Sequence, residues 1–250
     1  SRLYAAAGRW RELVDLHEAA LETVADRART ITYLEKIGQI YQEHLADPEH
    51  AALAYRRILD VDRQNLGALH ALERIYESTE RWTELCAMLQ IEAEQAQDPE
   101  QVASLLHRAG EILETRARDV EGALAMYRKV LGTTPTYIPA LRSLGRFYSR
   151  HRRWQDLVDM MRRELEVTVR RDEQVDLLFK IGEILRERLG RDDEALRFYQ
   201  EAVSVEPTYG PALRALERSF EARQDWDRLV EIIEAQAAAT ADPAARALIQ

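Results

Sequence analysis

Apolar residues recur at intervals of three and four along the whole sequence, the spacing of an amphipathic α-helix. VDLLFKIGEILRERL, residues 175–189, shows this spacing, and so does DEALRFYQEAVSV, residues 193–205. Prolines fall in or beside the segments between such stretches, where a missing amide hydrogen is tolerated. No convincing alternation of apolar and polar residues marks a β-strand. The pattern therefore predicts an all-α protein.

The sequence also repeats itself without a gap at an interval of 72 residues. Tryptophan and glycine positions show the repeat most clearly: Trp10, Trp82, Trp154 and Trp226, then Gly38, Gly110 and Gly182. Each interval contains four stretches with helical spacing, so we expect four helices, arranged as two helix pairs, in every 72 residues.

The first pair of each interval carries a recognisable pattern. In the last copy its residues are Leu178, Ile181, Gly182, Leu185, Ala195, Tyr199 and Pro207. The copies around Gly110 and Gly38 follow the same order, with Arg63 in place of the proline in the earliest. This pattern resembles the tetratricopeptide repeat. Because glycine has no Cβ atom, we expect the two helices of these pairs to cross closely at Gly38, Gly110 and Gly182.

The second pair of each interval is a more divergent version of the same pattern. Leu213, Leu216 and Phe220 occupy the corresponding places, but Glu217 stands at the glycine position and Leu229 at the alanine position. Gly145 restores the glycine in the middle copy. The resemblance therefore covers essentially the whole chain.

The fold implied by the resemblance is a right-handed superhelical solenoid of antiparallel helix pairs over residues 1–250. The expected pairs are 31–65, 66–102, 103–137, 138–174, 175–209 and 210–246. Residues 1–30 are expected to end a truncated pair, and residues 247–250 to begin another. Solenoids need polar capping helices at their termini, and neither end shows one. We therefore expect a fragment of a longer array.

Charge and composition narrow the classes of function. The net charge is −9, which disfavours nucleic acid and anionic membranes as general partners. No segment approaches the roughly 18 consecutive apolar residues of a membrane helix. The first ten residues lack the apolar segment of a signal peptide, so the compartment stays open, with the cytoplasm as first expectation. Most basic residues are arginine, which hints at a bacterial source.

The sequence offers no catalytic, metal or cofactor motif. It has no phosphate-binding loop, no glycine-rich dinucleotide motif and no nucleophile elbow. His44 and His50 flank a turn without the spacing of metal ligands. Cys86 aligns with Val14 and Val158, so we interpret it as a core residue rather than a reactive thiol. We expect no enzyme activity, no cofactor and no metal site.

In the tetratricopeptide family the first helix of each pair lines a concave groove, and this resemblance suggests candidate partner-binding residues. They are Arg142, Arg146, Arg214, Arg218, His107, Glu111, Phe179 and Glu183. The paired arginines are four residues apart, so each pair could grip a carboxylate-rich strand or a phosphate. The alternative is internal compensation, with Glu111 pairing with Arg146 and Glu183 with Arg146 or Arg218. Phe179 is either a peptide anchor or packed against an adjacent helix.

A segment rich in arginine spans residues 139–171, where nine arginines stand against four acids. Such a segment could dock an acidic partner. The alternative is a solvated face whose charges are balanced by neighbouring repeats.

Each tryptophan is predicted to open the second helix of a divergent pair. Trp82, in the stretch STERWTEL, follows charged and hydroxyl residues rather than an apolar run. An indole ring can lie across the turn onto its own pair and the next one. We therefore interpret the four tryptophans as structural and expect their rings to be covered.

The function that these features favour is a non-catalytic protein–protein interaction scaffold for a protein or peptide partner. One alternative is a regulatory arm of a larger enzyme or signalling protein. Another is self-association through uncapped repeat ends. The Lys and Asn residues of the family's carboxylate clamp are missing from the matching places, which disfavours chaperone tails as partners.

Overall fold

The computed structural model describes residues 2–241 of the chain and the side chains of residues 3–234. This part contains fourteen α-helices and one π-helical turn, and no β-strand. The prediction of an all-α fold is confirmed.

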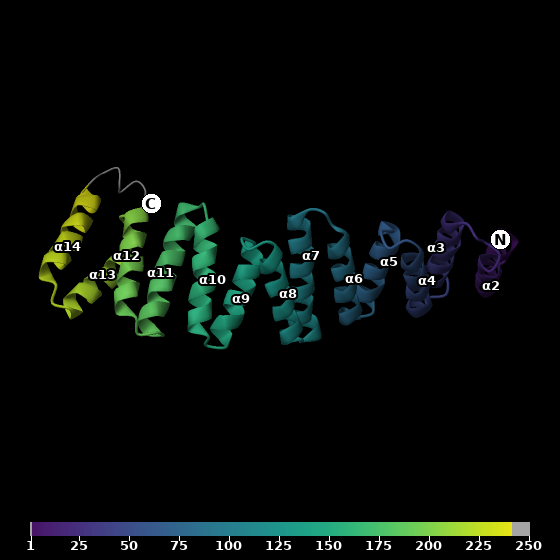
Figure 1. Cartoon of the computed structure of the whole chain (residues 1–250), viewed down its shortest axis with the longest axis horizontal. Helices are drawn as coiled ribbons and strands as arrows, with labels where there is room; N and C mark the ends of the chain where they lie inside the picture. The colour runs from purple at the N-terminus through teal and green to yellow at the C-terminus, as the bar shows by residue number, and fades with distance from the viewer. Residues whose placement is uncertain (1, 242–250) are drawn as a thin grey trace. The chain divides into compact units, whose positions relative to one another are not determined.

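The chain divides into two compact units, residues 1–134 and residues 135–250, which we call unit 1 and unit 2. The helices of unit 1 are α1 (Arg2–Ala6), α2 (Trp10–Leu21), α3 (Arg27–Glu43), α4 (Pro48–Val61), α5 (Leu66–Ser78), α6 (Trp82–Gln95), α7 (Pro99–Ile112), the π-helical turn η1 (Leu113–Ala117) and α8 (Val120–Thr133). Those of unit 2 are α9 (Ile138–Arg150), α10 (Trp154–Val167), α11 (Arg171–Glu187), α12 (Asp192–Val205), α13 (Gly210–Ala222) and α14 (Trp226–Ala241). Within each unit every helix packs on the next one along the chain, as a solenoid requires (Figure 1).

Short polar side chains fix where many of these helices begin. The residue before the helix accepts a hydrogen bond from a backbone amide of the first turn, which satisfies a donor that has no partner within the helix. The capping residues are Asp26, Asp47, Asn65, Asp98 and Asp119. Pro48 and Pro99 then occupy the first helical position, where proline is well tolerated.

The turns that precede the tryptophans are tight and left-handed. Glu80 and Arg152 have φ angles of 55° and 54°. The amide of Arg81 donates to the carbonyl of Tyr76 at 2.8 Å, and that of Arg153 to Tyr148 at 2.9 Å. These are the hydrogen bonds of a Schellman motif, which ends a helix and reverses the chain. Trp82 and Trp154 consequently open α6 and α10, as predicted.

A tyrosine ring packs directly on each of the three glycines of the first-type pairs. A Cβ atom added to Gly38, Gly110 or Gly182 would lie 2.7, 2.6 or 2.4 Å from a ring atom of Tyr55, Tyr127 or Tyr199. Real Cβ atoms essentially never come this close to another heavy atom, so no larger residue fits without displacing the ring. The expected close crossing of the two helices is therefore present.

Three tryptophan rings are half-buried and face a flat cationic or imidazole group. Trp10 stacks on His44 with ring centroids 3.6 Å apart. The guanidinium of Arg116 lies 5.6 Å from the ring centre of Trp82, and that of Arg188 lies 5.2 Å from Trp154. Such cation–π contacts add to the packing of each ring against its neighbours.

The expectation of a covered ring is wrong for Trp226, which is 57% exposed. On α14 the side chains of Val230 and Ile233 are also open, 51% and 49% exposed. In unit 2 the corresponding face of α10 packs against α11 and buries Val158 completely. No helix in the described part of the chain covers this face of α14 in the same way.

Within the described residues, none of the helices combines the length and the apolar character needed to span a bilayer.

Candidate functional site

Unit 2 contains a hollow of about 770 Å³ between α9, α10 and α11. Its apolar lining, which we call the floor, consists of Leu141, Leu157, Met160, Met161, Leu177 and Ile184. Because both Met side chains are unbranched and flexible, this floor can adapt to apolar groups of different shape. A volume of this size is typical of ligand sites in proteins.

Charged side chains of both signs surround this floor. Four are basic, namely Arg142, Arg146, Arg150 and Lys180, and four are acidic, namely Glu164, Glu173, Asp176 and Glu183. Their individual contacts decide which charges remain available to a ligand.

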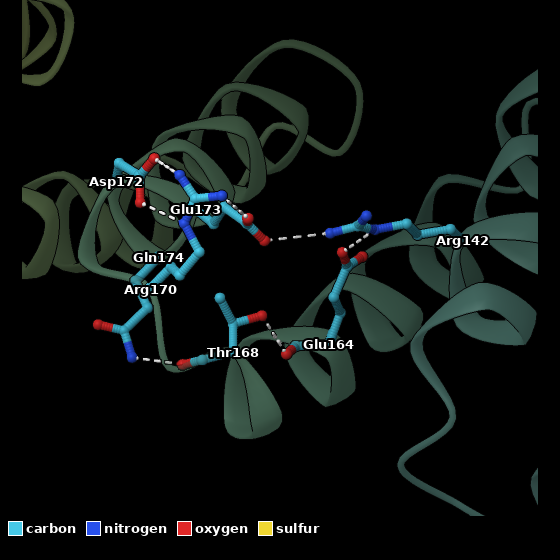
Figure 2. Close-up of polar contacts among 7 residues, drawn as sticks. All are labelled: Arg142, Glu164, Thr168, Arg170, Asp172, Glu173 and Gln174. Carbon is cyan, nitrogen blue, oxygen red and sulfur yellow. Dashed lines mark hydrogen bonds and ion pairs between the residues drawn. The ribbon is translucent and has the colours of Figure 1, made fainter. Parts of the chain in front are cut away.

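Arg142 is bound between two carboxylates, as Figure 2 shows. Its Nε donates to Glu164 at 2.5 Å and its Nη2 donates to Glu173 at 3.3 Å. Glu164 is only 6% exposed, so the arginine neutralises a carboxylate that has lost most of its water. The hydrogen bond to Glu164 raises the pKa of Arg142 above its ordinary value. Arg142 is therefore engaged in ion pairs within unit 2.

The connection between α10 and α11 is held by polar contacts that place Glu173 (Figure 2). The hydroxyl of Thr168 donates to the carbonyl of Glu164 at 2.8 Å, and Gln174 donates to the carbonyl of Thr168 at 2.6 Å. Arg170 contacts Asp172 at 2.6 Å and Glu173 at 3.1 Å. The hydrogen bond from Arg170 lowers the pKa of Asp172. These contacts fix the first turn of α11 at the edge of the hollow.

The two remaining acids also have partners inside unit 2. The hydroxyl of Tyr199 donates to Glu183 at 2.6 Å, and Arg186 contacts Glu183 at 3.1 Å. The hydroxyl of Tyr209 donates to Asp176 at 2.8 Å. Burial, followed by the bond to Asp176, raises the pKa of Tyr209 to about 12, so the phenol remains a donor at neutral pH.

Two cations of the hollow are left outside this network. Arg146 donates to the hydroxyl of Ser143 at 2.9 Å, and Lys180 is exposed on α11. Neither one forms an ion pair with any residue that the structure describes. Arg146 and Lys180 therefore line the hollow as cations without an ion pair, together with its apolar residues.

Unit 1 contains a smaller hollow at the corresponding place, of about 610 Å³, between α5, α6, α7 and η1. Its central cation is Arg108, the tenth residue of α7, as Lys180 is the tenth residue of α11. Unlike Lys180, Arg108 is paired: it contacts Glu73, and also Glu77 at 3.3 Å, both on α5. Equivalent helices line the two hollows, but the cation of the last helix is ion-paired in unit 1 and has no ion pair among the described residues of unit 2.

The predicted site residues are divided between several places. Arg142, Arg146 and Glu183 meet in the hollow of unit 2. Arg214 and Arg218 lie exposed on α13, where Arg218 donates to the carbonyl of Arg214 at 3.2 Å. Glu111 lines the hollow of unit 1.

Two predicted groove residues belong to the packing instead. His107 is only 9% exposed and its ring lies 5.4 Å from that of Tyr127, so the expectation of an open groove position is wrong. Phe179 packs between Tyr199 and Tyr209, with ring centroids 5.9 and 5.8 Å away. Of the two interpretations of Phe179, packing against adjacent helices is the one that the structure shows.

Internal charge compensation occurs, but with partners other than those expected. Glu183 pairs with Arg186 on its own helix, and Arg142 pairs with Glu164 and Glu173. Sequence reasoning missed Glu164, Met160 and Met161 because it placed only the first helix of each pair at the groove. The sequence did contain a signal for Glu164, because this carboxylate lies among the apolar positions of the second helix of its pair, α10.

The arginines of residues 139–171 are mostly engaged within unit 2. Arg153 contacts Asp156 at 2.8 Å and Arg162 contacts Glu194 at 3.3 Å. Arg163 donates to the carbonyl of Pro135 at 3.1 Å. Arg142 and Arg170 are also paired with acids of unit 2. These contacts favour the interpretation that neighbouring residues balance the charge of this segment, rather than the interpretation that the segment as a whole docks an acidic partner.

Cys86 is buried in unit 1, as expected of a core residue. It is 2% exposed, and its thiol donates to the carbonyl of Ala109 at 3.4 Å. Burial raises the pKa of the thiol to about 11, so the nucleophilic thiolate is scarce at neutral pH.

Comparison with known proteins identifies the family. A tetratricopeptide repeat model matches residues 1–30, 68–103, 140–175 and 212–247, more than half of the chain, and a second tetratricopeptide repeat model matches residues 176–209. The chain belongs to the tetratricopeptide repeat family. The first model matches the pairs that look divergent in the sequence, whereas only the last of the more regular pairs is matched. The divergent pairs are therefore tetratricopeptide repeats as much as the regular ones.

Solved structures with a similar fold are tetratricopeptide repeat proteins at low identity. The MamA protein is 17% identical, with 72% of this chain and 94% of MamA covered and a TM-score of 0.41. YrrB, described as a TPR protein with an unusual peptide-binding site, is 16% identical, with 79% and 95% covered and a TM-score of 0.40. A tetratricopeptide repeat protein from Parabacteroides merdae is 16% identical, with 82% and 78% covered and a TM-score of 0.41. No curated protein sequence matches this chain.

Family membership gives the general class of function. Tetratricopeptide repeats are generally non-catalytic interaction modules, and this chain is a protein-interaction scaffold of that class.

Proposed function

We propose that unit 2 binds a peptide segment of a partner protein in the hollow between α9, α10 and α11. The observation that carries this proposal is the hollow itself: about 770 Å³, with an apolar floor and a polar rim. α10 packs on both α9 and α11 and so holds the walls of the hollow, and little ordering is needed when a peptide enters. The residues that provide affinity are expected to be the apolar floor positions, because buried apolar contacts dominate most interfaces.

The proposal predicts that filling the floor weakens peptide binding. Gly145 lies at the floor, where an added Cβ would make only an ordinary contact, 3.4 Å from Leu157. Gly145→Met is therefore expected to fold and to weaken the binding of peptides selected from a random display library at least about tenfold, a loss of roughly 1.4 kcal/mol. Titration calorimetry measures the affinity.

The matched control is Gly132→Met on α8, where an added Cβ meets nothing within 4 Å. This variant is expected to bind the selected peptides like the parent protein. Equal affinity in Gly145→Met and Gly132→Met would contradict binding in the hollow of unit 2.

The open face of α14 favours a second function, association with another copy of the chain. Trp226, Val230 and Ile233 form one exposed stripe, whose counterpart on α10 includes the fully buried Val158. We expect the mass measured by light scattering to rise with concentration, and Ile233→Glu to prevent the rise. Glu231→Arg, an exposed site outside the stripe, serves as control. A mass fixed at one chain at every concentration would contradict self-association.

A further inference from the structure

We propose that the hollow of unit 2 selects acidic peptides, with an apolar side chain on the floor and flanking carboxylates on Arg146 and Lys180. This inference rests on the proposed function and adds the chemistry of the partner. It follows from comparing the hollow of unit 2 with the equivalent positions of unit 1, which lie 72 residues earlier in the chain.

The two hollows use corresponding positions on corresponding helices. The ninth residue of α5 is Arg74 and the ninth residue of α9 is Arg146. The tenth residue of α7 is Arg108 and the tenth of α11 is Lys180. The two hollows therefore share one cation position on the first helix and one on the last, and the hollow of unit 2 has Arg142 and Arg150 on α9 in addition.

In unit 1 two carboxylates neutralise Arg108, the cation on the last helix, and unit 2 lacks both of them. Arg108 contacts Glu73 and Glu77, the eighth and twelfth residues of α5. The eighth and twelfth residues of α9 are Gly145 and Ser149. Lys180 thus shares its hollow with a glycine and a serine at the positions where unit 1 has the two glutamates that pair with Arg108. The α9 wall thus has two carboxylates fewer than its counterpart in unit 1, whereas the α11 wall has two more, Glu173 and Asp176 in place of Gln101 and Ser104.

The same replacement opens the apolar floor. Gly145 has no side chain, and the nearest atom to a Cβ built on it is Cδ1 of Leu157, at 3.4 Å. A glutamate at this position would cover Leu157 and point its carboxylate at the cations. The glycine therefore leaves space next to Leu157, which is 8% exposed, in the hollow that Arg146 and Lys180 also line.

The acids that remain in the hollow are already engaged. Glu164 and Glu173 bind Arg142, Glu183 binds Tyr199 and Arg186, and Asp176 binds Tyr209. Tyr209 is neutral, so Asp176 keeps its charge, and the charges without an ion pair to a described residue are the cations Arg146 and Lys180 against this one carboxylate. An acidic peptide complements the excess of positive charge. A hydrogen bond from a charged donor to a carboxylate is stronger than a neutral one, so glutamate or aspartate is preferred over glutamine or asparagine.

The proposal is tested with two fluorescein-labelled peptides that share a core of two leucines. One carries glutamates around the core and the other carries glutamines. In fluorescence anisotropy at low salt, the acidic peptide is expected to bind the intact chain about tenfold more tightly than the glutamine peptide. Added sodium chloride is expected to reduce this difference in affinity, because salt screens the charges. Arg146→Gln and Lys180→Gln are each expected to weaken acidic-peptide binding about three- to tenfold.

The decisive variant rebuilds the wall of unit 1 in unit 2. Gly145→Glu with Ser149→Glu restores the two carboxylates opposite Lys180 and is expected to abolish the preference for the acidic peptide. Arg74→Gln in unit 1, the counterpart of Arg146→Gln, is expected to leave the affinity unchanged.

The outcomes separate this inference from the proposed function. If both peptides bind equally, and Gly145→Met still weakens them, the hollow binds peptides but the acidic preference is refuted. If neither peptide binds, and no peptide from a random library is lost in Gly145→Met, the proposed function itself is refuted. A loss of acidic-peptide binding in Arg74→Gln equal to that in Arg146→Gln would also overturn the assignment to unit 2.

Discussion

Replacing Gly182 with alanine is expected to destabilise unit 2 by about 2 kcal/mol. A Cβ atom there would lie 2.4 Å from the ring of Tyr199, which is completely buried and has no room to move away. Overpacking of this kind costs about 3 kcal/mol, and the better helix propensity of alanine returns roughly 1 kcal/mol. Urea unfolding followed by circular dichroism measures the difference.

Gly132→Ala is the control for helix propensity alone. Gly132 lies in α8 with open space around it, so this variant is expected to gain about 0.5–1 kcal/mol. A double-mutant cycle of Gly182→Ala with Tyr199→Leu should show a favourable coupling energy, because the smaller side chain makes room for the methyl group. If Gly182→Ala proved as stable as Gly132→Ala, the tyrosine would not limit this crossing.

Arg142→Ala is expected to lower the stability of unit 2 by about 2 kcal/mol. The substitution removes the group that neutralises Glu164, a carboxylate that is 6% exposed. A buried charge without a partner is costly, whereas a neutral amide of similar shape is less so. Glu164→Gln in the Arg142→Ala background is therefore expected to recover part of the loss in urea unfolding.

Arg214→Ala tests whether the effect comes from the ion pair. Arg214 is the fifth residue of α13, as Arg142 is the fifth residue of α9, and it makes no ion pair with any residue that the structure describes. Its replacement should change the free energy of unfolding by less than about 0.5 kcal/mol. An equal loss in both variants would mean that the arginine stem, and not the pair with Glu164, stabilises the helix.

The repeat pattern made much of the fold predictable, because the hydrophobic spacing acts locally. Trp82 and Trp154 begin helices at the expected residues, and Gly182 lies where its helix crosses the next one. Helical periodicity and glycine placement depend on neighbours three or four residues away, and these are visible in a single sequence.

The candidate site was predictable only in part. Arg142 and Arg146 were identified, and both line the hollow. The sequence could not show that Arg142 forms an ion pair with Glu164 on α10, whereas Arg146 forms none with the residues that the structure describes. His107 failed as a groove residue for the same reason, because its burial against Tyr127 depends on the neighbouring helix.

The sequence alone determined that this protein is all-α, that it is made of tetratricopeptide-like helix pairs, and which residues begin and cross its helices. Those properties follow from periodicity, from turn residues and from the size of glycine. Only the tertiary structure decided which charges neutralise one another and which remain open. Ion pairing depends on distances of a few ångströms between side chains on different helices. Arg142 pairs with Glu164 on α10, whereas Arg146, one turn further along α9, pairs with no residue that the structure describes.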